Sequence, residues 1–75
     1  MSLTEQQAER ISAQCRNGRE CVVRYFQGQP ILEWFGDSAA AGEAYRRQPR
    51  AELFRHGFWV ATRDYTTHFW DGAGI

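Results

Sequence analysis

The chain has 75 residues, enough for one small domain and too few for two, and its formal net charge is zero. Nine arginines, with no lysine, balance nine acidic residues. Proteins that bind nucleic acid usually carry a basic excess, because neutralising phosphates supplies much of their affinity. The balance of charge therefore argues against that class.

The sequence also indicates where the protein works. Its first residues lack the basic start and apolar run of a signal peptide, and no apolar run is long enough to span a bilayer. Two cysteines, Cys15 and Cys21, are too few for a disulfide scaffold. We therefore expect a single small domain over residues 1–75 that works in the cytoplasm without contacting a membrane.

A helix is predicted over residues 4–16. Thr4 followed by Gln7 fits a capping box, in which each residue satisfies a backbone N–H of the other. The apolar positions that follow have helical spacing, at Ala8, Ile11 and Cys15. This narrow stripe predicts that one side of the helix packs on the rest of the fold.

A β-hairpin is predicted next, because residues 20–26 and 31–35 are both rich in β-branched and aromatic side chains. A two-residue turn at Gly28-Gln29 would place Arg24 opposite Glu33. With that register, one face of the hairpin is apolar or nearly so, and it carries Val23, Tyr25, Leu32 and Trp34.

A second helix is expected to begin at Asp37 or Ser38 and to end at Arg47. Its side chains are unusually small, which would allow it to lie close against a sheet. Residues 50–56 are predicted to form a further short helical turn.

Residues 58–71 are predicted to form a second hairpin around Arg63-Asp64. This register places Phe58 opposite Phe69, on the predicted core side, and Trp59 beside His68, on the other side. The predicted fold class is therefore α+β in the order α-β-β-α-β-β. We expect one four-stranded antiparallel sheet, made from the two hairpins, with the helices packed on one face.

Signatures of catalysis are missing from the sequence. It contains no phosphate-binding glycine loop and no nucleophile elbow, and the spacing of Cys15 and Cys21 matches no common zinc motif. We interpret the two cysteines as separate, reduced thiols. Neither His56 nor His68 is accompanied by an oxyanion site in the sequence. We therefore expect no enzyme activity, no cofactor and no metal site.

The aromatic content is the main indication of function. Eleven aromatic side chains are more than so small a core can hold, so the surplus is expected to face another molecule. Tryptophan and arginine are frequent at the centres of interfaces. The predicted contact set lies on the outer face of the sheet and consists of Trp59, Trp70, Arg24, Arg63 and His68. A second, charged edge is predicted at Arg46, Arg47 and Arg50.

These features favour a non-enzymatic protein-binding module, with a homodimer through the same face as one form of it. Short, neutral and aromatic-rich, the chain is similar to accessory proteins of phages and plasmids, which often bind and block a host protein. The alternative is binding of single-stranded nucleic acid, whose bases would stack on the aromatic face. A third hypothesis is an enzyme with a cysteine nucleophile, in which alkylating Cys15 and Cys21 would abolish function without unfolding the chain.

Overall fold

The computed structural model describes residues 3–15, 18–48, 50–61 and 66–69, and for Phe58, Ala61 and residues 66–69 only the backbone. These segments form two helices and five strands: α1 (Glu5–Gln14), β1 (Glu20–Phe26), β2 (Gln29–Phe35), α2 (Ser38–Arg47), β3 (Glu52–Arg55), β4 (Phe58–Ala61) and β5 (Thr66–Phe69). The predicted α+β class is confirmed. Neither described helix has the length and apolar character that crossing a bilayer requires.

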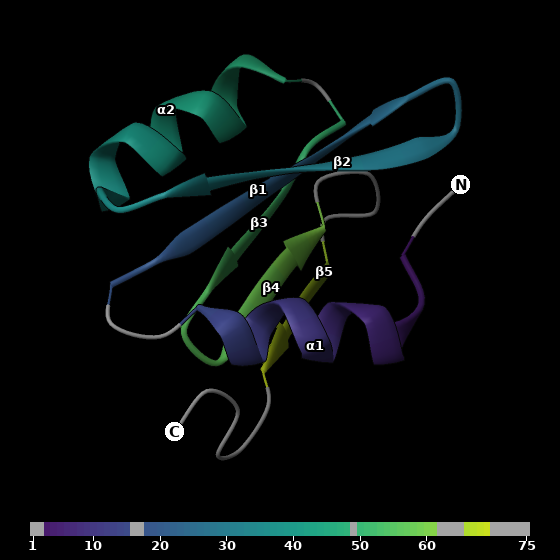
Figure 1. Ribbon diagram of the computed structural model, residues 1–75, viewed down its shortest axis with the longest axis horizontal. Coiled ribbons are helices and arrows are strands. Elements are labelled where there is room, and N and C mark those ends of the chain that lie inside the picture. The colour runs from purple at the N-terminus through teal and green to yellow at the C-terminus, as the bar shows by residue number, and fades with distance from the viewer. Residues whose placement is uncertain (1–2, 16–17, 49, 62–65, 70–75) are drawn as a thin grey trace.

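The strands form one antiparallel sheet in the order β2-β1-β3-β4-β5 (Figure 1). The sheet therefore has five strands, and the prediction of a helical turn over residues 50–56 is wrong. Leu53 and Phe54 point to opposite faces of β3, and both are buried. A strand covered on both faces lacks the alternation of polar and apolar residues that identifies a strand in a sequence.

The two helices cover opposite faces of the sheet. In Figure 1, α2 lies at the top and α1 crosses the lower parts of β4 and β5. Successive residues of β1 show the same division. Cys21 and Val23 belong to the hydrophobic cluster that includes α1, and Val22 belongs to the cluster that includes α2. The prediction that both helices pack on one face is wrong, because β1 carries buried apolar side chains on both of its faces and each face needs a cover.

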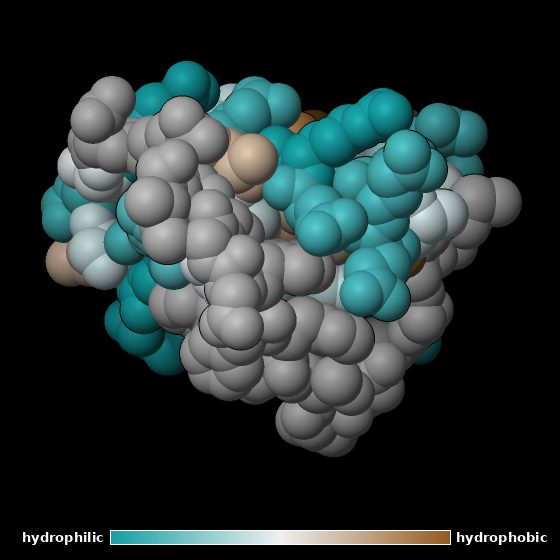
Figure 2. Space-filling view, turned by 90° about the horizontal axis from the view of Figure 1, so that it is seen from below, coloured by the Kyte–Doolittle hydropathy of each residue, from teal (hydrophilic) through white to brown (hydrophobic). Residues whose placement is uncertain are grey.

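Helix α1 begins as its sequence predicts. The Thr4 hydroxyl accepts a hydrogen bond from the Gln7 N–H, and the Gln7 side chain accepts one from the Thr4 N–H. The predicted stripe of Ala8, Ile11 and Cys15 is buried against the sheet. Seen from the α1 side, the described surface is mainly hydrophilic, with only small hydrophobic areas between (Figure 2). The helix therefore turns its polar sides outward, as an amphipathic helix should.

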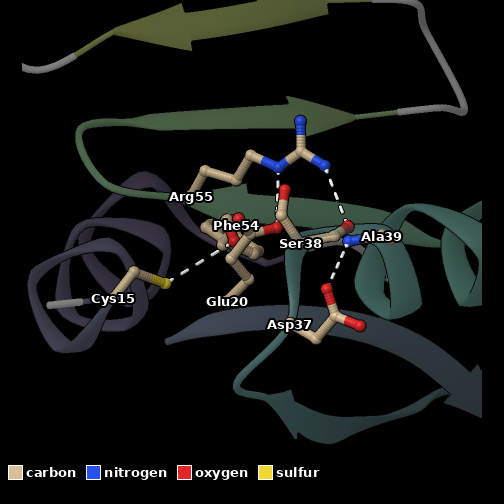
Figure 3. A network of polar contacts seen from close by, with 7 residues as sticks. All are labelled: Cys15, Glu20, Asp37, Ser38, Ala39, Phe54 and Arg55. Carbon is tan, nitrogen blue, oxygen red and sulfur yellow. Dashed lines mark hydrogen bonds and ion pairs between the residues drawn. The ribbon is translucent and has the colours of Figure 1, made fainter. Parts of the chain in front are cut away.

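Helix α2 begins at Ser38, where the Asp37 carboxylate accepts the Ala39 N–H at 3.0 Å. Arg55 on β3 ties this end of the helix to the sheet (Figure 3). Its Nε donates to Glu20 at 2.7 Å, and its Nη2 donates to the Ser38 carbonyl oxygen at 3.4 Å. Two of the small residues of α2, Ala41 and Gly42, are buried, and Ala41 packs in the cluster that contains Val22 and Leu53.

The β1–β2 hairpin turns at Gln27-Gly28, one residue earlier than predicted. Both turn residues have positive φ, 52° and 78°, which is the backbone of a type I′ turn. The pairing is displaced by two residues from the predicted register, so that Val23 lies opposite Leu32. A displacement of two residues leaves every side chain on the same face, so the predicted division of the hairpin into two faces is retained.

The register predicted for the second hairpin is confirmed where the structure describes it. Phe58 lies opposite Phe69, and Trp59 lies opposite His68. The predicted turn at Arg63-Asp64 lies outside the described residues.

Candidate interaction surface

The structure does not bring the predicted contact set together. Trp59 is only 6% exposed and packs beneath α1, so the prediction that it lies on an open face is wrong. Arg24 lies on the opposite face of the sheet, the face that α2 covers, where its Nε is 3.1 Å from Glu33. The backbone of His68 lies beside Trp59 in the sheet. Trp70 and Arg63 lie outside the described residues.

The predicted charged edge is on the surface. Arg46, Arg47 and Arg50 are all exposed. Arg47 forms an ion pair with Glu43, one turn earlier on α2, at a distance of 2.5 Å. An exposed pair of this kind contributes only a few tenths of a kcal/mol, so it leaves the arginine available to another partner.

Trp59 is buried together with a carboxylate that the sequence reasoning did not single out. Glu52 on β3 is 4% exposed, and it accepts the indole N–H of Trp59 at 2.9 Å. It also accepts a short hydrogen bond from the Tyr25 hydroxyl, and that hydroxyl in turn accepts the Leu3 N–H at 3.1 Å. The carboxylate therefore links β1, β3, β4 and the segment before α1, which is a structural role.

The two thiols lie in the core, in the cluster that contains α1. Burial raises the pKa of Cys15 from 9.0 to about 11, and burial together with the neighbouring Cys15 raises the pKa of Cys21 to about 12. The Cys15 Sγ donates to the Phe54 carbonyl oxygen at 3.6 Å (Figure 3). A thiolate nucleophile needs a lowered pKa and access to solvent, and these two thiols have neither.

The raised thiol pKa values predict that stability falls in alkali. From about pH 9 the unfolded chain loses thiol protons that the folded chain keeps, so the free energy of unfolding decreases as pH rises from the unfolded pKa toward the native values of about 11 and 12. We expect a loss of about 2 kcal/mol between about pH 8.5 and pH 10, measured by urea unfolding. A Cys15→Ala/Cys21→Ala variant should lose most of this dependence. The same slope in both proteins would contradict the assignment.

Part of the α1-side face remains open. Helix α1 packs mainly on β3 and β4, so the β1–β2 half of that face has less cover. Leu32 is 39% exposed there, and the neighbouring Trp34 and Tyr25 are only partly buried. The sequence analysis placed these three side chains on the apolar face of the hairpin, and the described residues cover that face only in part.

The backbone of β2 is open as well, because this seven-residue strand lies at the edge of the sheet and pairs only with β1 in the described part of the chain. The turn makes Phe26 and Gln29 a hydrogen-bonded pair, and such pairs alternate along an antiparallel ladder. By this alternation the N–H and C=O groups of Leu32 and Trp34 point away from β1. Pro30 occupies the third outward position, where its lack of an N–H breaks no bond within the sheet.

The positively charged side chain of Arg19 lies beside the same strand. The guanidinium group of Arg19 is 4.4 Å from the centroid of the Trp34 ring, which is the geometry of a cation–π contact. We call Arg19, Tyr25, Leu32, Trp34 and the outer edge of β2 the Trp34 platform. It combines exposed aromatic surface, an arginine and unpaired backbone groups.

Sequence reasoning missed the platform because it placed the predicted contact set, with Trp59, on the outer face of the sheet and Trp34 on the apolar face of the hairpin. One signal could have found it, since a proline inside a strand favours an edge position and Pro30 marks β2 in this way. No protein-family model, no curated protein and no solved structure matches this chain.

Proposed function

We propose that this chain is a small, non-enzymatic protein-binding module that takes up an extended segment of its partner as an additional strand on β2. The observation that carries the proposal is the outer edge of β2, which no other described strand pairs with. The outward backbone groups of Leu32 and Trp34 lie there beside their partly exposed side chains. In such complexes backbone hydrogen bonds supply affinity, and alternate side chains supply specificity. Blocking a host protein, as phage and plasmid accessory proteins do, is the role that we propose for it.

The described part of β2 has little protection along its outer edge, and this supports the proposal. Monomeric proteins usually blunt an edge strand with charged residues, especially lysine, with proline, or with a very short strand. Strand β2 has seven residues and no lysine, and its proline lies at the end nearest the turn. Glu33, the one charged residue on the strand, is engaged by Arg24 on the α2 side. The Trp34 end therefore stays open to a further strand.

A proline at position 32 tests this proposal. Because the Leu32 N–H points away from β1, Leu32→Pro removes a bond to the partner but none within the sheet. We expect recovery of the partner from cells of the native source to fall about tenfold or more, while the circular dichroism spectrum and cooperative unfolding persist. Equal recovery of the same proteins by wild type and Leu32→Pro would contradict strand addition.

Two matched variants complete the test. Glu33→Pro replaces the neighbouring residue, whose N–H bonds to β1, and it should destabilise the fold itself. Pro30→Ala adds an outward donor without changing the inner ladder, so it should keep or strengthen binding. Comparing the two proline variants at adjacent positions shows whether a loss of binding comes from the outer edge of β2 or from destabilisation of the whole hairpin.

Simple measurements distinguish two other molecules that could bind at this edge. A second copy could pair antiparallel with Leu32 opposite Leu32 and Trp34 opposite Pro30, and a doubled mass that Leu32→Pro reduces to that of a monomer would identify it. Single-stranded nucleic acid could stack on Trp34 beside Arg19. Salt-sensitive quenching of tryptophan fluorescence by an oligonucleotide would identify that ligand.

A further inference from the structure

The Trp34 platform presents hydrogen-bond donors that have no acceptor among the described residues. The Arg19 guanidinium group carries only donors, and so does the indole of Trp34. In the described part of the chain neither group donates to a side chain or a carbonyl, and the two groups contact each other through the cation–π stack alone. Two adjacent groups that can only donate hydrogen bonds are best matched by a group that can only accept them. Among protein side chains, the ionised carboxylate of aspartate or glutamate is such an acceptor.

The carboxylates nearest to Arg19 along the chain and across the hairpin already have partners. Glu20 is adjacent to Arg19, but its carboxylate is held by Arg55 at 2.7 Å. Glu33 is adjacent to Trp34, but its carboxylate is held by Arg24. Both of these pairs lie on the α2 side of the sheet, because Val22, between Glu20 and Arg24, packs in the α2 cluster. The positive charge of Arg19 on the α1 side is therefore uncompensated among the described residues.

We infer that the partner segment carries an aspartate or glutamate opposite Trp34 and an apolar side chain two residues away, opposite Leu32. This inference rests on the proposed function, because it places both side chains on a strand added to β2. Residues two apart on a strand share a face, so the acidic and the apolar side chain would both lie on the α1 side. There the carboxylate meets Arg19 and the Trp34 N–H, and the apolar side chain covers the exposed surface of Leu32.

Selection from a displayed library of random nonapeptides tests the inference, using immobilised wild type and Arg19→Glu as baits. The wild type should select peptides with an acidic residue two positions from an apolar one. Arg19→Glu should select arginine or lysine at the acidic position, because the charge of the bait is reversed. A synthetic peptide with aspartate at that position should bind the wild type about three- to tenfold more tightly than its asparagine analogue.

Arg10→Glu is the matched control, since it makes the same change of charge at an exposed position on α1 and should leave the acidic preference intact. Trp34→Phe keeps a ring beneath Arg19 but removes the indole N–H, so it should weaken the preference for aspartate without abolishing it. Selected peptides with no acidic enrichment, or the same peptides from wild type and Arg19→Glu, would overturn the inference alone. Failure of the wild type to select any peptide, or equal binding of its peptides to Leu32→Pro, would overturn strand addition as well.

Discussion

Replacing Phe54 with alanine is expected to lower the free energy of unfolding by about 3–5 kcal/mol. Phe54 is fully buried at the centre of the sheet, and its ring is parallel to that of Trp59, with 5.7 Å between the centroids. Removing the ring loses its transfer free energy and leaves a cavity beneath α1. A chain of 75 residues has a total stability of roughly 4–11 kcal/mol, so this one change could unfold much of the population.

Phe26→Ala is the matched control for this prediction. Phe26 is 59% exposed on the neighbouring strand, so the same substitution removes little buried surface and should cost less than about 1 kcal/mol. Urea unfolding of both variants at pH 7 measures the difference. Similar losses for Phe54→Ala and Phe26→Ala would mean that Phe54 is not at the centre of the core.

The elements that the sequence predicted well are those whose signals are local. Thr4 and Gln7 define the start of α1 through bonds within a single turn, and Asp37 does the same for α2. Alternation along a strand assigns its side chains to the two faces but leaves open a displacement by two residues, so the faces of both hairpins were predicted but the register of only the second. Strand β3 was missed because Glu52, a residue typical of exposed positions, is buried among aromatic donors from β1 and β4. Its environment is created by segments far away in the sequence.

The candidate site was predicted poorly for a similar reason. Because side chains alternate along a strand, the sequence predicts that Trp34 and Glu33 lie on opposite faces of the sheet, as do Trp59 and Val60. It does not predict which face a helix will cover. That choice depends on where α1 lies across the sheet, and α1 lies over Trp59 and leaves Trp34 partly exposed. The idea of surplus aromatic surface beside an arginine could be reached from composition. The residues that carry it, Arg19 and Trp34, could be identified only from the fold.

Removing the buried carboxylate of Glu52 is expected to lower the free energy of unfolding about as much as removing the Phe54 ring. Glu52→Ala should cost about 3–5 kcal/mol, because it removes the two buried hydrogen bonds that the carboxylate accepts from the Trp59 N–H and the Tyr25 hydroxyl. Glu52→Gln keeps the volume and one carbonyl acceptor, and its amide can donate to a reoriented Tyr25 hydroxyl. Its cost should be about 1–2 kcal/mol. Urea unfolding at pH 7 measures both variants.

A Trp59→Phe variant, alone and combined with Glu52→Ala, isolates the bond between the two residues. Phenylalanine keeps most of the packing on Phe54 but has no N–H to satisfy, so part of the cost of Glu52→Ala should disappear in the double variant. Glu43→Gln on the outer side of α2 removes a charge that is exposed, and should change stability by less than about 0.5 kcal/mol. Additive costs for Glu52→Ala and Trp59→Phe would show that the carboxylate does not hold the indole in place. The position of Trp59 beneath α1 would then need another cause. The exposure of Trp34 would need one too, because it depends on α1 lying over Trp59.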